Sequence, residues 1–227
     1  MTTLQIDFVS DVACPWCAVG LASFEHALKD LGGDIAVELH FQPFELNPTM
    51  GAEGADAAEY LIAKYGMSRE QLAEGRARIA ERGAAVGFTF GERKHVWNTF
   101  DAHRLLHWAG VEGQALGGSE RSGFADLSPQ HALKRALLKA YHGEGRNPGA
   151  HDVLLELATA VGLDAARAQL VLVSKEFTDE VREAERFWQE AGINAVPAVV
   201  INRRHLISGG QPPEVFAQAL RKIAAEG

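Results

Sequence analysis

The sequence predicts an α/β protein in which strands near both ends of the chain flank a long helical block. Short segments near the two ends are rich in apolar residues with the spacing of β-strands. Through the middle of the chain, apolar residues recur at the spacing of amphipathic helices. A Cys-x-x-C sequence, Cys14 to Cys17, lies between the first predicted strand and the first predicted helix.

The N-terminal segment predicts a strand–helix–strand unit. Residues 4–9 have a strand pattern, residues 19–28 a helix pattern, and residues 35–41 carry apolar side chains at every second position. Pro43 and Pro48 then end the second strand, because proline cannot donate a hydrogen bond to a neighbouring strand. A connection of this kind predicts two parallel strands.

The middle of the chain is predicted to be helical. Gly66 is a suitable helix stop, and Ser128 followed by Pro129 is a favourable N-cap and first helical residue. Residues 115–126 contain three glycines and predict a loop. The helices are expected over residues 57–65, 68–85, 98–108, a segment starting at 128, 153–161 and 164–173.

The C-terminal segment predicts a helix–strand–strand–helix unit. Residues 174–191 form a long amphipathic helix, and residues 213–225 form the last one. Between them, residues 197–201 and 205–208 are strands joined by a turn at 202–204.

The 227 residues suit one large domain or one domain with an insertion. We assign residues 1–47 and 174–227 to a discontinuous α/β domain. Residues 48–173 form an inserted all-helical domain, which has no predicted sheet of its own and packs over one end of the other domain's sheet.

Composition narrows the class of function. The net charge of −8 argues against a nucleic-acid partner, because phosphate binding requires a basic face. No apolar run is long enough for a membrane span, and the N-terminus lacks the basic and apolar stretches of a secretory signal. We therefore expect a cytoplasmic protein with no membrane partner. In that compartment a Cys-x-x-C is catalytic, redox-sensing or metal-binding.

The sequence Cys14-Pro15-Trp16-Cys17 predicts a redox centre. The unpaired N–H groups and dipole at a helix N-terminus favour the thiolate of Cys14, which is the reactive form. Pro15 suits the first helical turn, and Trp16 either contacts substrate or covers the cysteines. The two-residue spacer lets Cys17 form a disulfide with Cys14. With no other cysteine in the chain, this pair is the only thiol chemistry available.

The cysteines have two alternative interpretations. One is a pair of inert buried thiols, which this spacing before a helix argues against. The other is a zinc site completed by His103 and His107, which are four residues apart on one predicted helix. Pro15 and Trp16 at a strand–helix junction, and the long separation of the histidines from the cysteines, argue against zinc. We expect no metal and no organic cofactor.

Four phrases of the sequence, residues 10–17, 98–105, 192–202 and 207–211, resemble the DsbA-like family and, within it, the FrnE-like branch. The resemblance spans nearly the whole chain. It implies an α/β thioredoxin fold (βαβ + αββα) with an inserted all-helical domain, and a protein dithiol–disulfide oxidoreductase activity. Some FrnE-like proteins carry a second cysteine pair near the C-terminus. This chain has none, so the resemblance does not extend to a four-thiol relay.

The resemblance also implies roles for individual residues. Val196-Pro197 would hold a cis peptide bond facing the cysteines, where the backbone of Val196 pairs with an extended substrate. Asn98 and His103 would lie near the mouth of the active site and orient substrate; a packing role for His103 is the competing reading. Expected partners are protein or small-molecule disulfides, with glutathione among the latter.

Related branches of the same architecture are 2-hydroxychromene-2-carboxylate isomerases and kappa-class glutathione transferases. These relatives generally have serine where this chain has Cys14 and lack the second cysteine, so the intact pair favours redox chemistry. The alternative enzyme is a glutathione-dependent isomerase or transferase whose substrate is enclosed by an aromatic lid of Trp97, Phe100 and Trp108. The non-enzymatic alternative is a redox sensor or a chaperone partner.

Two carboxylates are candidates for proton transfer to and from Cys17. Asp7 lies on the strand that leads to the cysteines, and Asp11 lies just before them. The strand pattern alone leaves open which way Asp7 faces, and a solvated carboxylate is the expectation for it.

Overall fold

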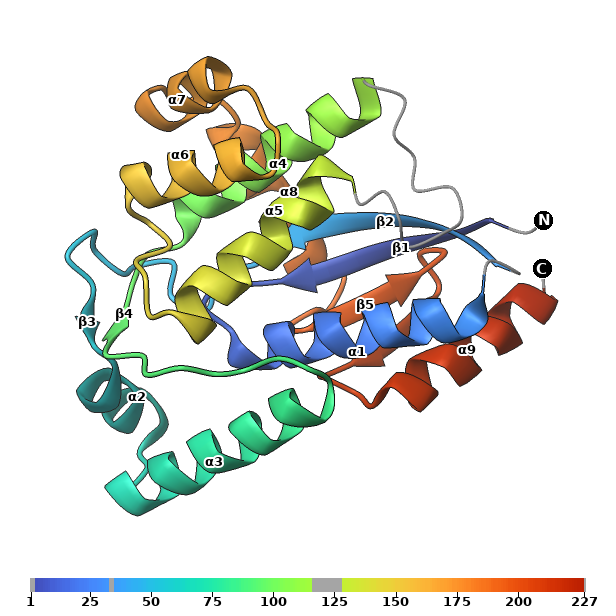
Figure 1. Cartoon of the computed structure of the whole chain (residues 1–227), viewed down its shortest axis with the longest axis horizontal. Helices are drawn as coiled ribbons and strands as arrows, with labels where there is room; N and C mark the ends of the chain where they lie inside the picture. The colour runs from blue at the N-terminus through green and yellow to red at the C-terminus, as the bar shows by residue number, and fades with distance from the viewer. Residues whose placement is uncertain (1–2, 33–34, 116–127, 227) are drawn as a thin grey trace.

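The computed structural model describes residues 3–32, 35–115 and 128–226, and it is built around a four-stranded mixed sheet (Figure 1). The strands lie in the order β2-β1-β5-β6, with β1 parallel to β2 and antiparallel to β5. Their bounds are β1 Thr3–Ser10, β2 Ala36–Pro43, β5 Ala198–Ile201 and β6 His205–Ser208.

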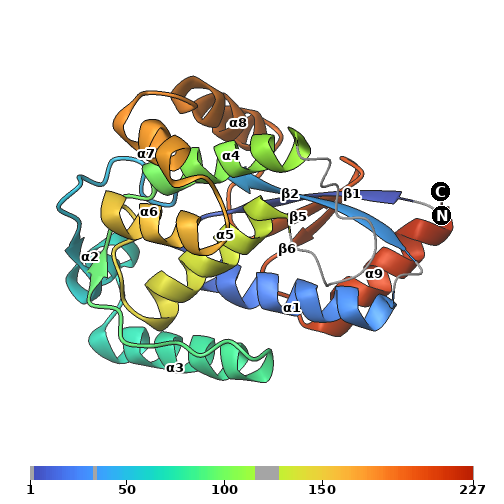
Figure 2. The same ribbon diagram turned by 45° about the horizontal axis from the view of Figure 1, so that its top comes forward.

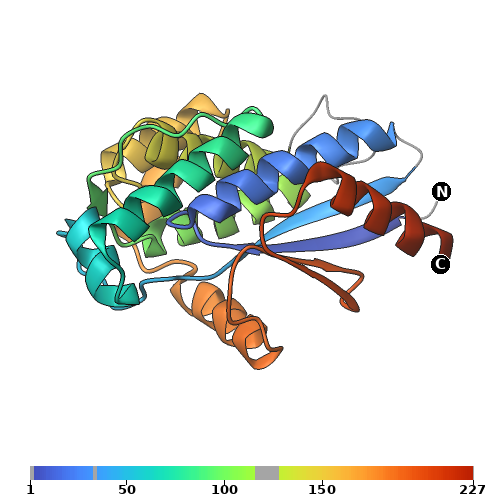
Figure 3. The ribbon, with the colours of Figure 1, turned by 90° about the horizontal axis from the view of Figure 1, so that it is seen from below.

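Helices cover both faces of this sheet. Helices α1 (Pro15–Leu31) and α9 (Pro213–Glu226) lie together on one face, and α8 (Thr178–Glu190) lies on the other (Figure 3). Side chains alternate between the two faces of the sheet along β1, so this strand packs against the helices on both faces. Leu4, Ile6 and Phe8 pack with α1 and α9, whereas Val9 packs with Trp188 of α8.

The insertion between β2 and α8 is mostly helical. Helices α4 to α7 pack together at one end of the sheet, and α3 runs beside α1 (Figures 1 and 2). The elements are α2 Ala57–Tyr65, α3 Arg69–Ala85, α4 Phe100–Ala115, α5 Pro129–Leu138, the π-helical turn η1 Lys139–Gly143, α6 His151–Ala160 and α7 Ala165–Val173.

The predicted order of strands and helices is confirmed, but the insertion and two helix bounds differ from the prediction. Helix α4 runs to Ala115 and not to 108. The insertion contains a short two-stranded sheet, β3 (Ala55–Asp56) with β4 (His95–Val96), which is too short to leave an alternating pattern in the sequence. Helix α8 begins at Thr178 and not at 174, because the preceding Phe177 has a left-handed φ of 60°. The predicted loop at 115–126 falls almost entirely outside the described residues.

Two hydrophobic cores meet at the segment that follows β1. The first core is formed by the sheet with α1 and α9, and the second by α4 to α7. Val12 and Ala13, just before the first cysteine, belong to the second core. The insertion therefore supports the cysteine-bearing loop directly. The domain boundaries at 47/48 and 173/174 stay a prediction.

Among the described helices, none combines the length and the apolar character that crossing a membrane requires.

Candidate active site

The two cysteines lie at the junction of β1 and α1. Strand β1 ends at Ser10, a short turn follows, and Pro15 is the first residue of α1. Cys14 is the N-cap residue with an extended backbone (φ −87°, ψ 114°), and its side chain does not cap the helix. The first turn contains no acidic residue. The Cys14 sulfur is therefore placed at the positive end of the helix without a neighbouring negative charge in that turn.

The two thiols differ in depth. Cys14 is 4% exposed, Cys17 is completely buried, and both are free. Burial, together with the hydrogen bond and charge of the adjacent Cys14, raises the pKa of the Cys17 thiol well above its ordinary value. Cys14 is thus the more exposed of the two thiols, and the raised pKa of Cys17 favours its protonated form.

A cis peptide bond between Val196 and Pro197 lies against the cysteines, as the family resemblance implied. The Cys14 thiol donates to the Val196 carbonyl oxygen at 3.5 Å, across 182 positions of sequence. Gly20 of α1 allows this approach, because a Cβ there would lie 3.0 Å from Cγ of Pro197. Val196 is half-buried and lies beside the sulfur.

The Asp11 side chain holds the loop before Cys14 in place. It is fully buried and accepts hydrogen bonds from four groups: Ala13 N at 3.0 Å, Leu46 N at 2.7 Å, Thr99 Oγ1 at 2.8 Å and His103 Nε2 at 3.3 Å. Burial alone would raise the pKa of Asp11, but the attraction of His103 and the backbone donors hold it below its ordinary value. Asp11 is therefore a weak base that organises the loop.

Two residues of the insertion bind the carbonyl groups just before Cys14. His142 Nε2 donates to the Val12 carbonyl at 2.8 Å, and Arg93 donates to the Ala13 carbonyl at 3.2 Å. Burial lowers the pKa of His142 to about 3, so its ring is neutral. Its Nδ1 lies 3.5 Å from the Arg93 guanidinium and accepts there. Neither residue could be assigned to the site from the sequence, since no motif spacing links them to the cysteines.

Asp7 is buried and not solvated, contrary to the expectation from the strand pattern. Its side chain is 1% exposed, and Gln42 donates to its Oδ1 at 2.7 Å. By the alternation along β1, Asp7 faces away from the side of the sheet that carries α1. It is therefore separated by the sheet from the body of the helix that contains Cys17.

The predicted substrate-contacting residues fall into two groups. Pro15, Trp16 and Val196 are half-buried near Cys14, whereas Pro197 is buried. The other two lie inside the insertion. His103 is 2% exposed and bonded to Asp11, and Asn98 donates to the Met50 carbonyl at 2.9 Å while accepting from Phe100 N at 2.8 Å. These contacts give both residues a structural role; a role in substrate binding stays a prediction.

The comparisons with known proteins agree with this geometry. Residues 5–221 match the DSBA-like thioredoxin domain family. A crystal structure described as a probable DsbA oxidoreductase from Streptomyces coelicolor is 34% identical, with a TM-score of 0.85, over 99% of this chain and 91% of that chain. This chain belongs to the DsbA-like thioredoxin family. The match supports an oxidoreductase of the thiol type.

Two further matches extend the comparison. The uncharacterized protein YwbO of Bacillus subtilis is 28% identical over 96% of each chain. A 2-hydroxychromene-2-carboxylate isomerase structure, 15% identical with a TM-score of 0.69, covers 98% of this chain and 97% of that chain, and it shows a shared fold only. The DsbA-like architecture is therefore common to redox and isomerase proteins.

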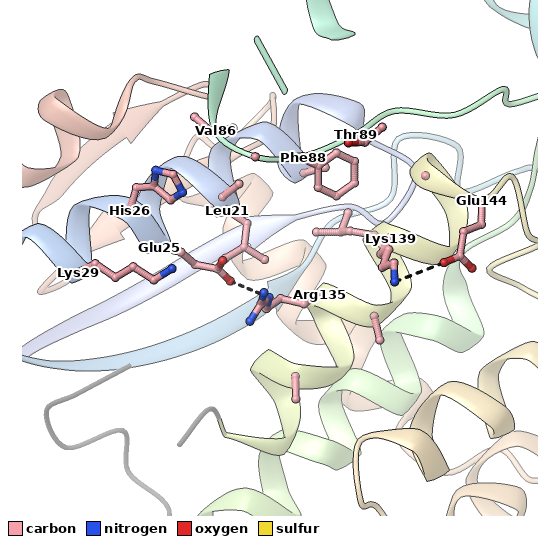
Figure 4. Close-up of a pocket in the computed structure, with 17 residues that line it drawn as sticks. Leu21, Glu25, His26, Lys29, Val86, Phe88, Thr89, Arg135, Lys139 and Glu144 are labelled. Atoms are coloured by element: carbon pink, nitrogen blue, oxygen red, sulfur yellow. Dashed lines mark ion pairs between the residues drawn. The ribbon is translucent and has the colours of Figure 1, made fainter. Parts of the chain in front are cut away.

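The aromatic residues that could have formed a substrate lid in this DsbA-like protein are engaged elsewhere. Trp108 is 1% exposed in the helical core, Trp97 stacks on His95, and the Arg182 guanidinium lies 3.8 Å from the Phe100 ring centre. A cavity of about 750 Å³ between α1 and α5 is lined by other residues, among them Glu25 and Arg135 (Figure 4). Neither the cysteines nor these aromatics line it.

The described residues do not form the zinc site of the alternative interpretation. Within the described part of the chain, no three His, Cys, Asp or Glu side chains are grouped to hold a metal ion. His103 is directed at Asp11, and His107 packs against Phe177, with a ring-centre distance of 5.2 Å.

The buried His142 ring predicts a loss of stability in mild acid. In the unfolded chain histidine takes up a proton near its ordinary pKa of 6.5, whereas the folded pKa of His142 is about 3. The unfolded state therefore binds more protons between these values, and stability falls as the pH falls through 6.5 toward 3. From about pH 7.5 to pH 5, His142 should cost about 2 kcal/mol of unfolding free energy.

Urea unfolding of His142→Gln at the two pH values measures this contribution. Glutamine can still donate to the Val12 carbonyl but does not titrate, so the variant should lose about 2 kcal/mol less than wild type on acidification. His95→Gln, at an exposed ring, is the matched control and should keep the wild-type loss. Equal losses in wild type and His142→Gln would contradict the neutral, buried ring.

Proposed function

We propose that this protein is a thiol–disulfide oxidoreductase that uses Cys14 as nucleophile and Cys17 as resolving thiol. One observation carries the proposal: the Cys14 thiol at a helix N-terminus, which is 4% exposed, lies beside the completely buried thiol of Cys17 and 3.5 Å from the Val196 carbonyl. The Cys14 thiolate attacks a substrate disulfide and forms a mixed disulfide. Cys17 then attacks Cys14, releasing the reduced substrate and leaving the Cys14–Cys17 disulfide; the reverse sequence oxidises a dithiol.

The surroundings of Cys14 support an extended disulfide-bearing substrate. The Val196 backbone beside the buried Pro197 offers hydrogen bonds to a peptide in extended conformation. Pro15 and Trp16 present apolar surface next to the sulfur. Protein disulfides are the proposed main substrates, and small disulfides, glutathione disulfide among them, fit the same chemistry. The reaction uses only the two thiols and requires no metal or organic cofactor.

Trapping with Cys17→Ser tests the proposal. Without the resolving thiol, the mixed disulfide at Cys14 cannot be released, so the variant should accumulate covalent adducts when incubated with cell extract. Non-reducing electrophoresis followed by mass spectrometry identifies each partner and the cysteine that it occupies. We expect several proteins bound to Cys14, released by a reductant.

The control is the Cys14→Ser/Cys17→Ser double variant, which should capture nothing. Recovery of glutathione alone on Cys14, with no protein, would count against protein substrates. A glutathione-dependent isomerase would instead keep its full rate after Cys17→Ser, because that chemistry needs no resolving thiol. Assignment to the FrnE-like branch and a cytoplasmic location stay predictions from the sequence.

A further inference from the structure

Arg93 is a positively charged residue beside the active site that the reaction described above does not use. It lies on the segment between α3 and β4, which runs past the N-terminal end of α1 (Figure 1). Its Nη1 donates to the Ala13 carbonyl oxygen at 3.2 Å. That oxygen belongs to the same peptide unit as the backbone nitrogen of Cys14. The guanidinium is therefore held one peptide unit away from the residue that carries the nucleophilic sulfur.

The backbone just before Arg93 is fixed closely against η1. The Gly91 amide donates to the His142 carbonyl at 2.9 Å. The two segments approach so closely that a Cβ at Gly91 would lie 2.1 Å from the Gly143 oxygen, so only glycine can occupy this position. The partner segment is a π-helical turn, which is often found at functional sites. The position of Arg93 is therefore set by its neighbours in the insertion.

The groups that hold the Arg93 side chain do not cancel its charge. Besides the carbonyl contact, Nη1 lies 3.5 Å from Nδ1 of His142, and the guanidinium carbon lies 5.1 Å from the centre of the Tyr141 ring. Burial and the charge of Arg93 lower the pKa of His142 to about 3, so this ring is neutral. Among the described residues, no carboxylate forms an ion pair with Arg93, and the adjacent Glu92 is paired with Lys94 at 3.6 Å. A fixed and uncompensated positive charge therefore lies beside the loop before Cys14.

The guanidinium of Arg93 also has unused donors. Both of its polar contacts involve Nη1, and in the described part of the chain Nε and Nη2 have no acceptor. The residue is half-buried, and neither of these two nitrogens is fully buried, so both can be reached from solvent. Nε and Nη2 form the edge of a planar fork whose geometry matches the two oxygens of a carboxylate. The free edge of the guanidinium therefore suits an anionic group from outside the protein.

We infer that Arg93 binds a carboxylate group that lies close to the disulfide of the substrate. This inference rests on the proposed oxidoreductase function and narrows its substrates to disulfides that carry negative charge. When the substrate sulfur is at Cys14, a carboxylate a few bonds away can reach the free edge of the guanidinium. The carboxylate belongs to a small anionic disulfide or to an acidic residue beside a protein disulfide. Arg93 orients the substrate and takes no part in the exchange of the sulfur–sulfur bonds.

Small disulfides of similar size and different charge test this inference. 3,3′-Dithiodipropionate carries carboxylates, 2-hydroxyethyl disulfide is neutral, and cystamine carries ammonium groups. Each is mixed with the reduced protein, and acid quenching followed by mass spectrometry measures the rate at which the Cys14 thiol is lost. In Arg93→Met we expect the rate constant for dithiodipropionate to fall about tenfold, the scale of one lost charge-assisted hydrogen bond. The rate constants for the neutral and cationic disulfides should fall by less than about twofold, because neither has a carboxylate to lose.

Two further variants separate substrate binding from support of the loop. Arg93→Lys keeps the charge but loses the planar fork, so it should recover part of the rate with dithiodipropionate. Arg221→Met is the matched control, because Arg221 of α9 also donates to a backbone carbonyl, that of Asp30 at 3.3 Å, and should leave every rate unchanged. Equal slowing with all the disulfides in Arg93→Met would show that Arg93 only supports the loop before Cys14, and would overturn the inference. An unchanged rate with dithiodipropionate would overturn it as well.

Two larger substrates distinguish the sources of the carboxylate. Glutathione disulfide represents small anionic disulfides. A disulfide-linked peptide with glutamate beside its cysteine, compared with the same peptide carrying glutamine, represents proteins. Slower reaction of glutathione disulfide in Arg93→Met assigns the site to small disulfides, and loss of a wild-type preference for glutamate over glutamine assigns it to protein disulfides. Absence of both effects would overturn the inference. Failure of the proposed function is distinct, because the wild-type Cys14 would then react with none of these disulfides.

Discussion

Replacement of Cys14 by serine should abolish disulfide turnover, with kcat/KM falling on the order of a thousandfold or more. The serine hydroxyl is far less acidic than a thiol, and the helix N-terminus that favours a thiolate cannot make it an effective nucleophile. Cys17 cannot substitute for it, because Cys17 is completely buried and burial raises its pKa. Reduction of insulin disulfides, followed by turbidity, measures the loss.

The comparison variant for this prediction is Cys17→Ser. It also loses turnover, but it should still react once with a model disulfide, releasing one equivalent of thiolate per chain. Cys14→Ser should release none in the same time. Turnover retained in Cys14→Ser would contradict the role of Cys14 as nucleophile. A single reaction in Cys14→Ser, with none in Cys17→Ser, would reverse the two assigned roles.

Replacement of Arg104 by methionine should lower the free energy of unfolding by about 3–5 kcal/mol. The guanidinium is 4% exposed and binds the end of α7 and the turn after it. Its nitrogens donate to four carbonyl groups: Val171 at 2.6 Å, Leu172 at 3.3 Å, Ser174 at 3.2 Å and Glu176 at 3.0 Å. The last carbonyls of a helix have no partner within the helix, so removing Arg104 leaves buried acceptors unsatisfied.

Asp101 adds to this cost, because it is paired with Arg104 at 2.7 Å; in the variant, His151 at 2.6 Å is its remaining side-chain partner among the described residues. Urea unfolding of Arg104→Met measures the effect. The matched control is Arg146→Met, which removes an exposed pair with Glu156 and should cost less than about 1 kcal/mol. Similar losses in the two variants would show that the carbonyl contacts of Arg104 contribute little.

Local patterns in the sequence predict most of the strands and helices of this fold. Ser128 and Pro129 start α5, and Gly66 ends α2 with a left-handed φ of 63°, because capping depends on neighbouring residues alone. The start of α8 could not be predicted in this way. The sequence continues a helical pattern through Phe177, but that residue adopts a left-handed backbone.

The sequence by itself determined the strand and helix order and the position of the Cys14–Cys17 pair, and its resemblance to the DsbA-like family indicated the fold family. The order and the position of the pair follow from periodicity, from caps and from the Cys-x-x-C spacing, all of which act over a few residues. Only the tertiary structure decided which groups surround those thiols. Asp11 meets His103 across 92 positions, and His142 meets Val12 across 130. Such contacts depend on how the insertion packs on the sheet, and burial there decides whether a carboxylate or an imidazole can exchange a proton.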